Sequence, residues 1–72
     1  MTIVDIDYSN LFMEALQYLQ SNYKKFPKFM IEITAEQYGI PSAEIKNLIN
    51  FFLRKGMLKI IKNEGFYYQL NL

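Results

Sequence analysis

Apolar residues recur at helical spacing in three stretches of the chain. The first stretch runs from Tyr8 to about Asn22, and Asp7 or Ser9 is placed to cap its first turn. Its apolar positions are three or four residues apart, which predicts an amphipathic helix: Leu11, Phe12, Ala15, Leu16 and Leu19.

A second helix is predicted from about Lys28 to Tyr38, with Ile31, Ala35 and Tyr38 on one face. Pro27 is expected as its first residue, because the first turn of a helix tolerates a missing backbone N–H. The segment "FMIEIT" is rich in β-branched residues, so a short strand at the start of this region is the alternative.

A sharp corner follows the second helix. Gly39 supplies the left-handed residue that ends a helix, and Pro41 prevents its continuation. Ser42 is expected to cap a third helix that ends near Lys55 and is closed by Gly56. The apolar stripe of this helix comprises Ile45, Leu48, Ile49, Phe52 and Leu53.

After Gly56, "MLKIIK" and "FYYQLNL" predict two strands of a hairpin around "NEG", where Gly65 can take a positive φ. Alternation predicts that one face of the second strand is core and the other is solvated. The expected core residues are Phe66, Tyr68, Leu70 and Leu72, and the expected solvated ones are Tyr67, Gln69 and Asn71. Residues 1–7 are expected to form a short strand or a loose arm.

These elements predict one α+β, mainly α, domain over residues 1–72, with three helices followed by a C-terminal β-hairpin. The 72 residues include no cysteine and no histidine, which excludes disulfides, thiolate or imidazole metal sites, and Cys-His or Ser-His catalytic pairs. The carboxylates are scattered singly and no glycine-rich loop can hold a phosphate, so we expect no enzyme, metal or cofactor. No apolar run is long enough to span a bilayer and the N-terminus is acidic, so we expect a cytoplasmic protein without a membrane partner.

The charges are unevenly distributed along the chain. Residues 1–22 carry three acids and no base, whereas residues 23–72 carry all eight bases and four acids, for a formal net charge of +1. The basic part contains the corner, a distribution that suits a nucleic-acid partner on one side of the domain.

The order of the elements resembles the winged helix-turn-helix superfamily of DNA-binding domains over residues 9–72. The resemblance lies in "AEQYGIPSAEIKNLINFFLRKGML" followed by "KIIKNEGFYYQL". The matching features are Ala35, the corner Gly39 with Ile40, the capping Ser42, and the step Gly56 with Met57 and Leu58. The resemblance implies that helix 42–55 is a recognition helix and that residues 59–68 form the wing.

A helical rotation of 100° per residue places Ala43, Asn47, Asn50 and Arg54 opposite the apolar stripe. This face can enter a major groove, because asparagine pairs with adenine and arginine pairs with guanine or phosphate. The same residues are also ordinary solvent-facing side chains, and that alternative stays open. Further candidate DNA contacts are Ser42 and Lys46 on the same helix, Lys59, Lys62 and Asn63 on the hairpin, and Lys24, Lys25 and Lys28 in the loop. For Lys46 a snorkelling position over the core is the alternative.

The favoured function is therefore binding of double-stranded DNA, as a transcriptional regulator or as an accessory factor in replication or in plasmid or virus maintenance. A homodimer through helix 8–22, the acidic part of the chain, would add phosphate contacts. The alternative is a winged-helix module that binds protein and no nucleic acid, supported by Phe51, Ile61 and Tyr67. Phe51 is expected either to pack against helix 8–22 or its loop, or to contact a partner. A third alternative is single-strand binding through exposed tyrosines.

Overall fold

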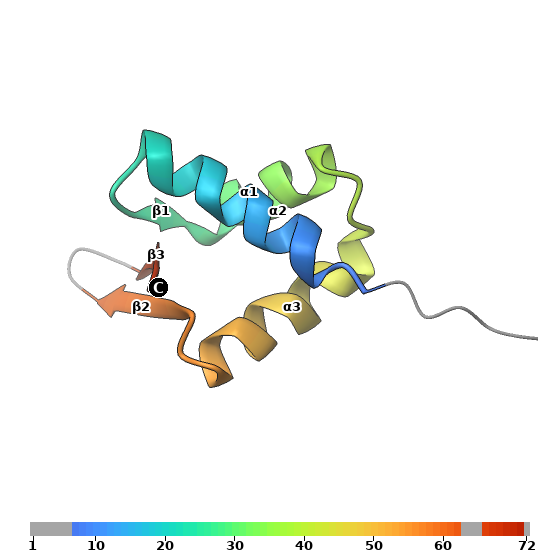
Figure 1. The fold of residues 1–72 in the computed structure, drawn as a ribbon. Helices are drawn as coiled ribbons and strands as arrows, with labels where there is room; N and C mark the ends of the chain where they lie inside the picture. Colours follow the sequence, from blue (N-terminus) through green and yellow to red (C-terminus); the bar gives the residue numbers. More distant parts are fainter. Residues whose placement is uncertain (1–6, 63–65, 72) are drawn as a thin grey trace, which may run out of the picture.

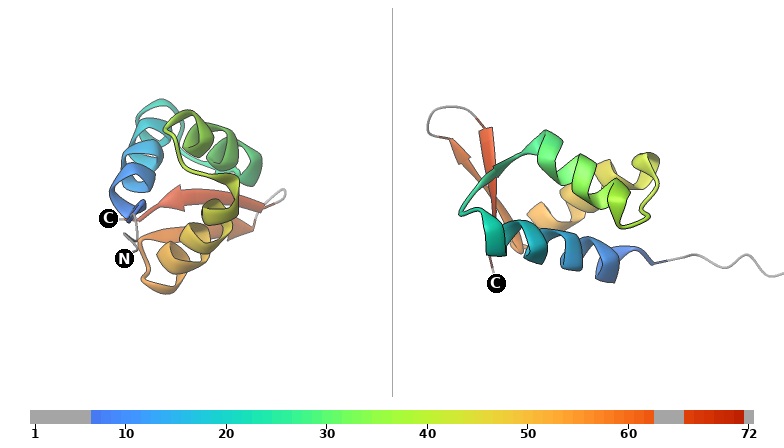
Figure 2. Two further views of the ribbon diagram at one scale, coloured as in Figure 1. Left: turned by 90° about the vertical axis from the view of Figure 1, so that its right-hand side faces the viewer. Right: turned by 90° about the horizontal axis from the view of Figure 1, so that it is seen from above.

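The computed structural model describes residues 7–62 and 66–71. The helices and strands follow one another in the order α1 (Ser9–Asn22), β1 (Phe26–Pro27), α2 (Lys28–Gln37), α3 (Ser42–Arg54), β2 (Leu58–Lys62) and β3 (Phe66–Leu70). Three helices are packed together and a small sheet lies at one end of them (Figures 1 and 2). The predicted fold class, with three helices before a C-terminal hairpin, is confirmed as a winged-helix-like topology. In the described residues no helix has the length and apolar character needed to cross a bilayer.

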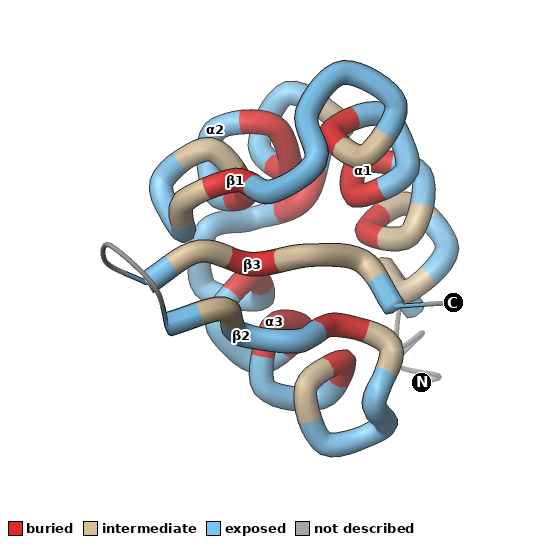
Figure 3. The backbone as a smooth tube through the Cα atoms, turned by 90° about the vertical axis from the view of Figure 1, so that its left-hand side faces the viewer, coloured by how far each residue is buried: buried red, intermediate tan, exposed pale blue. Residues whose placement is uncertain are grey.

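The sheet has three antiparallel strands in the order β1-β3-β2, so that β3 lies in the middle (Figure 3). The β2–β3 pairing joins Leu58 to Leu70 and Lys62 to Phe66, as the predicted hairpin requires. The third strand was not predicted at this position: the alternative strand was expected in "FMIEIT", but the strand is Phe26–Pro27 and pairs with Tyr68 and Tyr67. Proline is tolerated there because β1 is an edge strand.

The core lies between the three helices and the inner side of the sheet. Phe12 of α1 and Phe52 of α3 meet edge to face with ring centroids 4.9 Å apart, and both are almost fully buried. The predicted stripes are confirmed on α1 and α3, except that Leu11 and Leu53 are only half-buried. The remaining core residues are Ala15, Leu16, Leu19, Phe26, Ile31, Ala35, Ile40, Ile45, Leu48, Ile49, Leu58 and Tyr68.

The starts of the helices differ in detail from the predictions. At α1 the backbone N–H of Ser9 donates to Asp7 Oδ1 at 2.9 Å, while Tyr8 is the N-cap residue. The Ser9 hydroxyl, and after it the Ser9 amide, hold the pKa of the Asp7 carboxyl below its ordinary value.

At α3 the prediction of a Ser42 cap was wrong. Ser42 is the first helical residue, and the N-cap is Pro41, whose φ of −60° and ψ of 141° are extended. The ring of proline fixes φ near this value and its carbonyl oxygen accepts the Glu44 amide at 2.9 Å, so the turn forms without a side-chain cap. Pro27 likewise precedes α2 as its N-cap instead of opening the helix.

Two glycines end helices α2 and α3 in the same manner. Gly39 has φ +90° and Gly56 has φ +77°. After α2 the Ile40 amide donates to the Ala35 carbonyl at 3.1 Å and the Gly39 amide to Glu36 at 3.0 Å, the two bonds of a Schellman motif. The corresponding bonds after α3 join Met57 to Phe52 and Gly56 to Leu53. The predicted roles of both glycines are therefore confirmed.

Gly39→Ala is expected to lower the free energy of unfolding by about 1–2 kcal/mol, because an L-residue in left-handed backbone carries that cost. A Cβ at this position meets no atom within 4 Å, so the cost is one of backbone conformation alone. Urea unfolding followed by circular dichroism measures it. Gly39→Asn is the matched control and should lose less stability, since asparagine tolerates the left-handed backbone conformation. An alanine variant as stable as the parent would contradict the assignment.

The predicted burial of the second hairpin strand was correct at its centre and wrong at its start. Tyr68 is buried, but Phe66 is 67% exposed. Leu70 is half-buried, and so are Tyr67 and Gln69, which were expected to be solvated. Phe66 lies on the inner face of the sheet and pairs with Lys62 next to the turn of the hairpin. The core therefore does not cover the inner face of the sheet at the first residue of β3. The predicted arm at residues 1–6, the turn at 63–65 and Leu72 lie outside the described residues.

Candidate nucleic-acid interface

The outer face of α3 presents four side chains to solvent. Ala43, Asn47, Asn50 and Arg54 are all exposed, while the opposite stripe of the helix is buried in the core. These four residues are called the α3 face below. The predicted separation of the two sides of the helix is confirmed, and the face carries amides and a guanidinium that can pair with base edges or phosphates.

The two flanks of the α3 face differ in chemistry. Ser42 lies on the flank toward α2, where it and the buried Ile45 line a pocket shared with that helix. The helical rotation places Lys46 on this flank, and its side chain is exposed. On the other flank Phe51 is 38% exposed, lies edge-on to Phe52 at 6.0 Å between ring centroids, and has the Lys55 Nζ 5.6 Å from its ring.

All eight basic residues belong to the described residues and all are exposed. On the sheet, Lys62 Nζ is 5.9 Å from the Phe66 ring and Lys25 Nζ is 4.9 Å from the Tyr67 ring. These distances place each ammonium group within cation–π range of an aromatic ring, on lysine side chains that are exposed. The predicted site residue Asn63 lies outside the described residues.

The sheet separates the predicted basic contacts into two groups. Lys59 and Lys62 are on β2, whereas Lys24, Lys25 and Lys28 flank β1, and β3 lies between the two strands. Lys59 and Lys62 belong to the hairpin that follows α3 directly, but they are three residues apart on β2 and so lie on opposite faces of the sheet.

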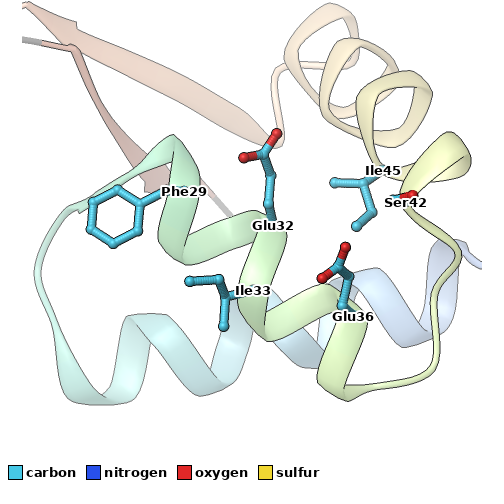
Figure 4. Close-up of a pocket in the computed structure, with 6 residues that line it drawn as sticks. All are labelled: Phe29, Glu32, Ile33, Glu36, Ser42 and Ile45. Carbon is cyan, nitrogen blue, oxygen red and sulfur yellow. The ribbon is translucent and has the colours of Figure 1, made fainter.

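Two carboxylates that the sequence interpretation did not single out extend from α2 toward the side of α3 (Figure 4). Glu32 and Glu36 are exposed, and they line an open pocket of about 310 Å³. The full lining is Phe29, Glu32, Ile33, Glu36, Ser42 and Ile45. The i, i+4 spacings of Glu32 with Glu36 and of Phe29 with Ile33 are the signals that predict this mixed surface. Since Glu44 is also in the first turn of α3, the N-terminal end of that helix is acidic and its C-terminal half is not.

The apolar residues of α1 are used in the core of the same chain. Its exposed surface carries Asn10, Glu14, Gln17, Ser21 and Tyr18, of which Tyr18 is the one large apolar side chain, 52% exposed. The homodimer predicted through helix 8–22 remains a prediction.

Within residues 7–62 and 66–71 no three metal-ligating side chains lie close enough together to hold an ion. Comparison of the chain with protein-family models, with curated proteins and with solved structures gave no match.

Proposed function

We propose that this chain is a winged helix-turn-helix protein that binds double-stranded DNA through α3. The observation that carries the proposal is the α3 face: two amides and a guanidinium, all exposed, on the helix that follows the Gly39 corner. Such a helix fits the width of a major groove, and its side chains offer the donors and acceptors that base edges recognise.

In the proposed complex the middle and the C-terminal end of α3 make the base contacts. Asn47 and Asn50 are suited to adenine, and Arg54 is suited to guanine or phosphate. Glu32, Glu36 and Glu44 disfavour phosphate near the N-terminal end of the helix, so the DNA backbone runs closer to the hairpin.

The remaining predicted contacts position the protein without reading sequence. Lys59, on the outer face of the hairpin, and Lys62, on its inner face, contact the backbone at different points, and Lys24, Lys25 and Lys28 contact another stretch. Such a module serves a transcriptional regulator or an accessory factor in replication or in plasmid or virus maintenance, and it would act in the cytoplasm. A homodimer through α1 doubles the number of phosphate contacts.

The salt dependence of binding tests the proposal. Fluorescence anisotropy of a random-sequence duplex and of a matching single strand is measured with the protein at low and at physiological salt. We expect duplex binding whose affinity falls steeply with salt, by about one unit of log–log slope for each phosphate contact. Absence of binding to both strand forms at low salt would overturn the proposal, and preference for the single strand would indicate stacking on tyrosines instead.

A protein-binding module is the second candidate function. It is favoured by exposed apolar side chains on α2 and β3, since Phe29 is 59% and Phe66 is 67% exposed. Binding through these apolar side chains would change less with salt than phosphate-driven binding does.

A further inference from the structure

Two surfaces of the chain are complementary to each other. The first is the pocket between α2 and α3, in which the apolar Phe29 and Ile33 are accompanied by Glu32 and Glu36. The second is formed by Ile60, Lys62 and Phe66 on the inner face of the hairpin, and is called the hairpin patch below. The pocket combines apolar area with negative charge, and the hairpin patch combines apolar area with positive charge.

The hairpin patch exists because the hairpin is longer than the core beneath it. Lys62 and Phe66 are paired across the two strands, and Ile60 lies two residues from Lys62 and so on the same face. On that face Tyr68 and Leu58 are buried, but Ile60 is 40% and Phe66 is 67% exposed. Lys62 Nζ is 5.9 Å from the Phe66 ring, so an aromatic group and a cation are presented together.

The pocket has the size and the charge to accept these groups. A cavity of about 150 Å³ is enough for benzene, and the pocket of about 310 Å³ therefore has room for a phenyl ring. Phe29 and Ile33, 59% and 51% exposed, offer apolar contact to such a ring. Glu32 and Glu36 lie beside it and can pair with the ammonium group (Figure 4).

We propose that the chain associates head to tail, with the hairpin patch of one copy seated in the pocket between α2 and α3 of the next. The occupant is a second copy because the same chain carries both complementary surfaces. A formal net charge of +1 leaves little repulsion between copies. The two surfaces are different, so the contact is heterologous and builds open chains or a closed ring.

Sedimentation velocity without DNA tests the association independently of the proposed DNA binding. For the parent protein we expect the mean mass to rise above the 8.6 kDa of one chain as concentration increases, and to fall again at high salt. A parent that remains monomeric up to millimolar concentration would overturn the proposal.

Two variants test the contributions of the pocket and of the hairpin patch one at a time. The pocket variant, Glu32→Lys with Glu36→Lys, and the hairpin variant, Lys62→Glu with Phe66→Ser, should each be monomeric by itself. Mixed in equal amounts at the parent's association concentration, they should form a complex of two chains and nothing larger, because each brings one intact surface. Two monomers that fail to combine would overturn the head-to-tail arrangement. All four positions are exposed, and circular dichroism checks that the variants remain folded.

The matched control is Tyr18→Ser with Lys24→Glu, which removes an exposed aromatic group and reverses a cation away from both surfaces. It should associate as the parent does. Loss of association in this control, with retention in the pocket and hairpin variants, would mean that copies meet through α1 and would overturn the proposal.

Discussion

Phe52→Ala is expected to lower the free energy of unfolding by about 3–5 kcal/mol, the cost of deleting a buried phenyl ring. Phe52 is 2% exposed, and its ring meets Phe12 edge to face at 4.9 Å. A domain of 72 residues has a total stability of roughly 4–11 kcal/mol. The variant is therefore expected to lose a large part of the stability of the domain, from about a quarter upward. Urea unfolding followed by far-UV circular dichroism measures the loss.

The adjacent phenylalanine supplies the matched control. Phe51 is 38% exposed and contacts the Phe52 ring and the Lys55 ammonium group at its own surface. Phe51→Ala removes the same atoms but leaves no buried cavity, and we expect a loss of about 1 kcal/mol or less. Equal losses at positions 51 and 52 would contradict the orientation of α3 about its axis, and with it the exposure of the α3 face.

The helices could be predicted from sequence because their signals are local. The stripe from Ile45 to Phe52 repeats with the period of a helix, and Gly39 and Gly56 occupy the left-handed residue of a Schellman motif that needs hydrogen bonds within six residues. The exact first residue of α3 was not predictable in this way. Serine is common as an N-cap and proline is common one residue later, yet here Pro41 holds the cap position.

The sheet could not be predicted fully from local sequence signals. The pairing of Phe26 and Pro27 with β3 joins residues about forty positions apart, and two residues carry no strand periodicity of their own. The alternation along β3 correctly placed Tyr68 inside, but it could not show that the helices end before Phe66. How far a core extends beneath a hairpin depends on tertiary packing. The alternation of side chains along a strand carries no information about that packing.

Only part of the candidate site could be predicted, because only part of it depends on local signals. The exposure of Asn47, Asn50 and Arg54 follows from the rotation of one helix. The acidic pocket depends on how α2 and α3 meet at the Gly39 corner, and it brings Glu36 beside Ser42 and Ile45 (Figure 4). Glu32 and Glu36 were therefore counted as scattered carboxylates, although the structure places them at one border of the candidate interface.

Asn50→Ala with Arg54→Ala is expected to weaken duplex binding at least about 30-fold, if both side chains contact bases as proposed. Each lost base contact costs about 1–3 kcal/mol, and each 1.4 kcal/mol is a factor of about ten in affinity. Both residues are exposed and outside the core, so the fold should be retained. Competition with unrelated sequences distinguishes the two roles, because loss of a base contact relaxes specificity whereas loss of a phosphate contact weakens all sequences alike.

A control with the same chemistry removes one amide and one cation outside the α3 face. Gln37→Ala with Lys55→Ala serves this purpose, since both residues are exposed and Lys55 lies over the Phe51 ring on the other flank of α3. Its affinity should fall only by the general electrostatic effect of one lost charge, and by the same factor for every sequence. If the control loses as much affinity for duplex DNA as the variant in the α3 face does, binding depends on net charge alone. In that case α3 is not the helix that reads the groove. If only the α3 variant loses affinity and specificity together, the direction in which the Gly39 corner holds α3 is what makes the domain a reader of duplex DNA.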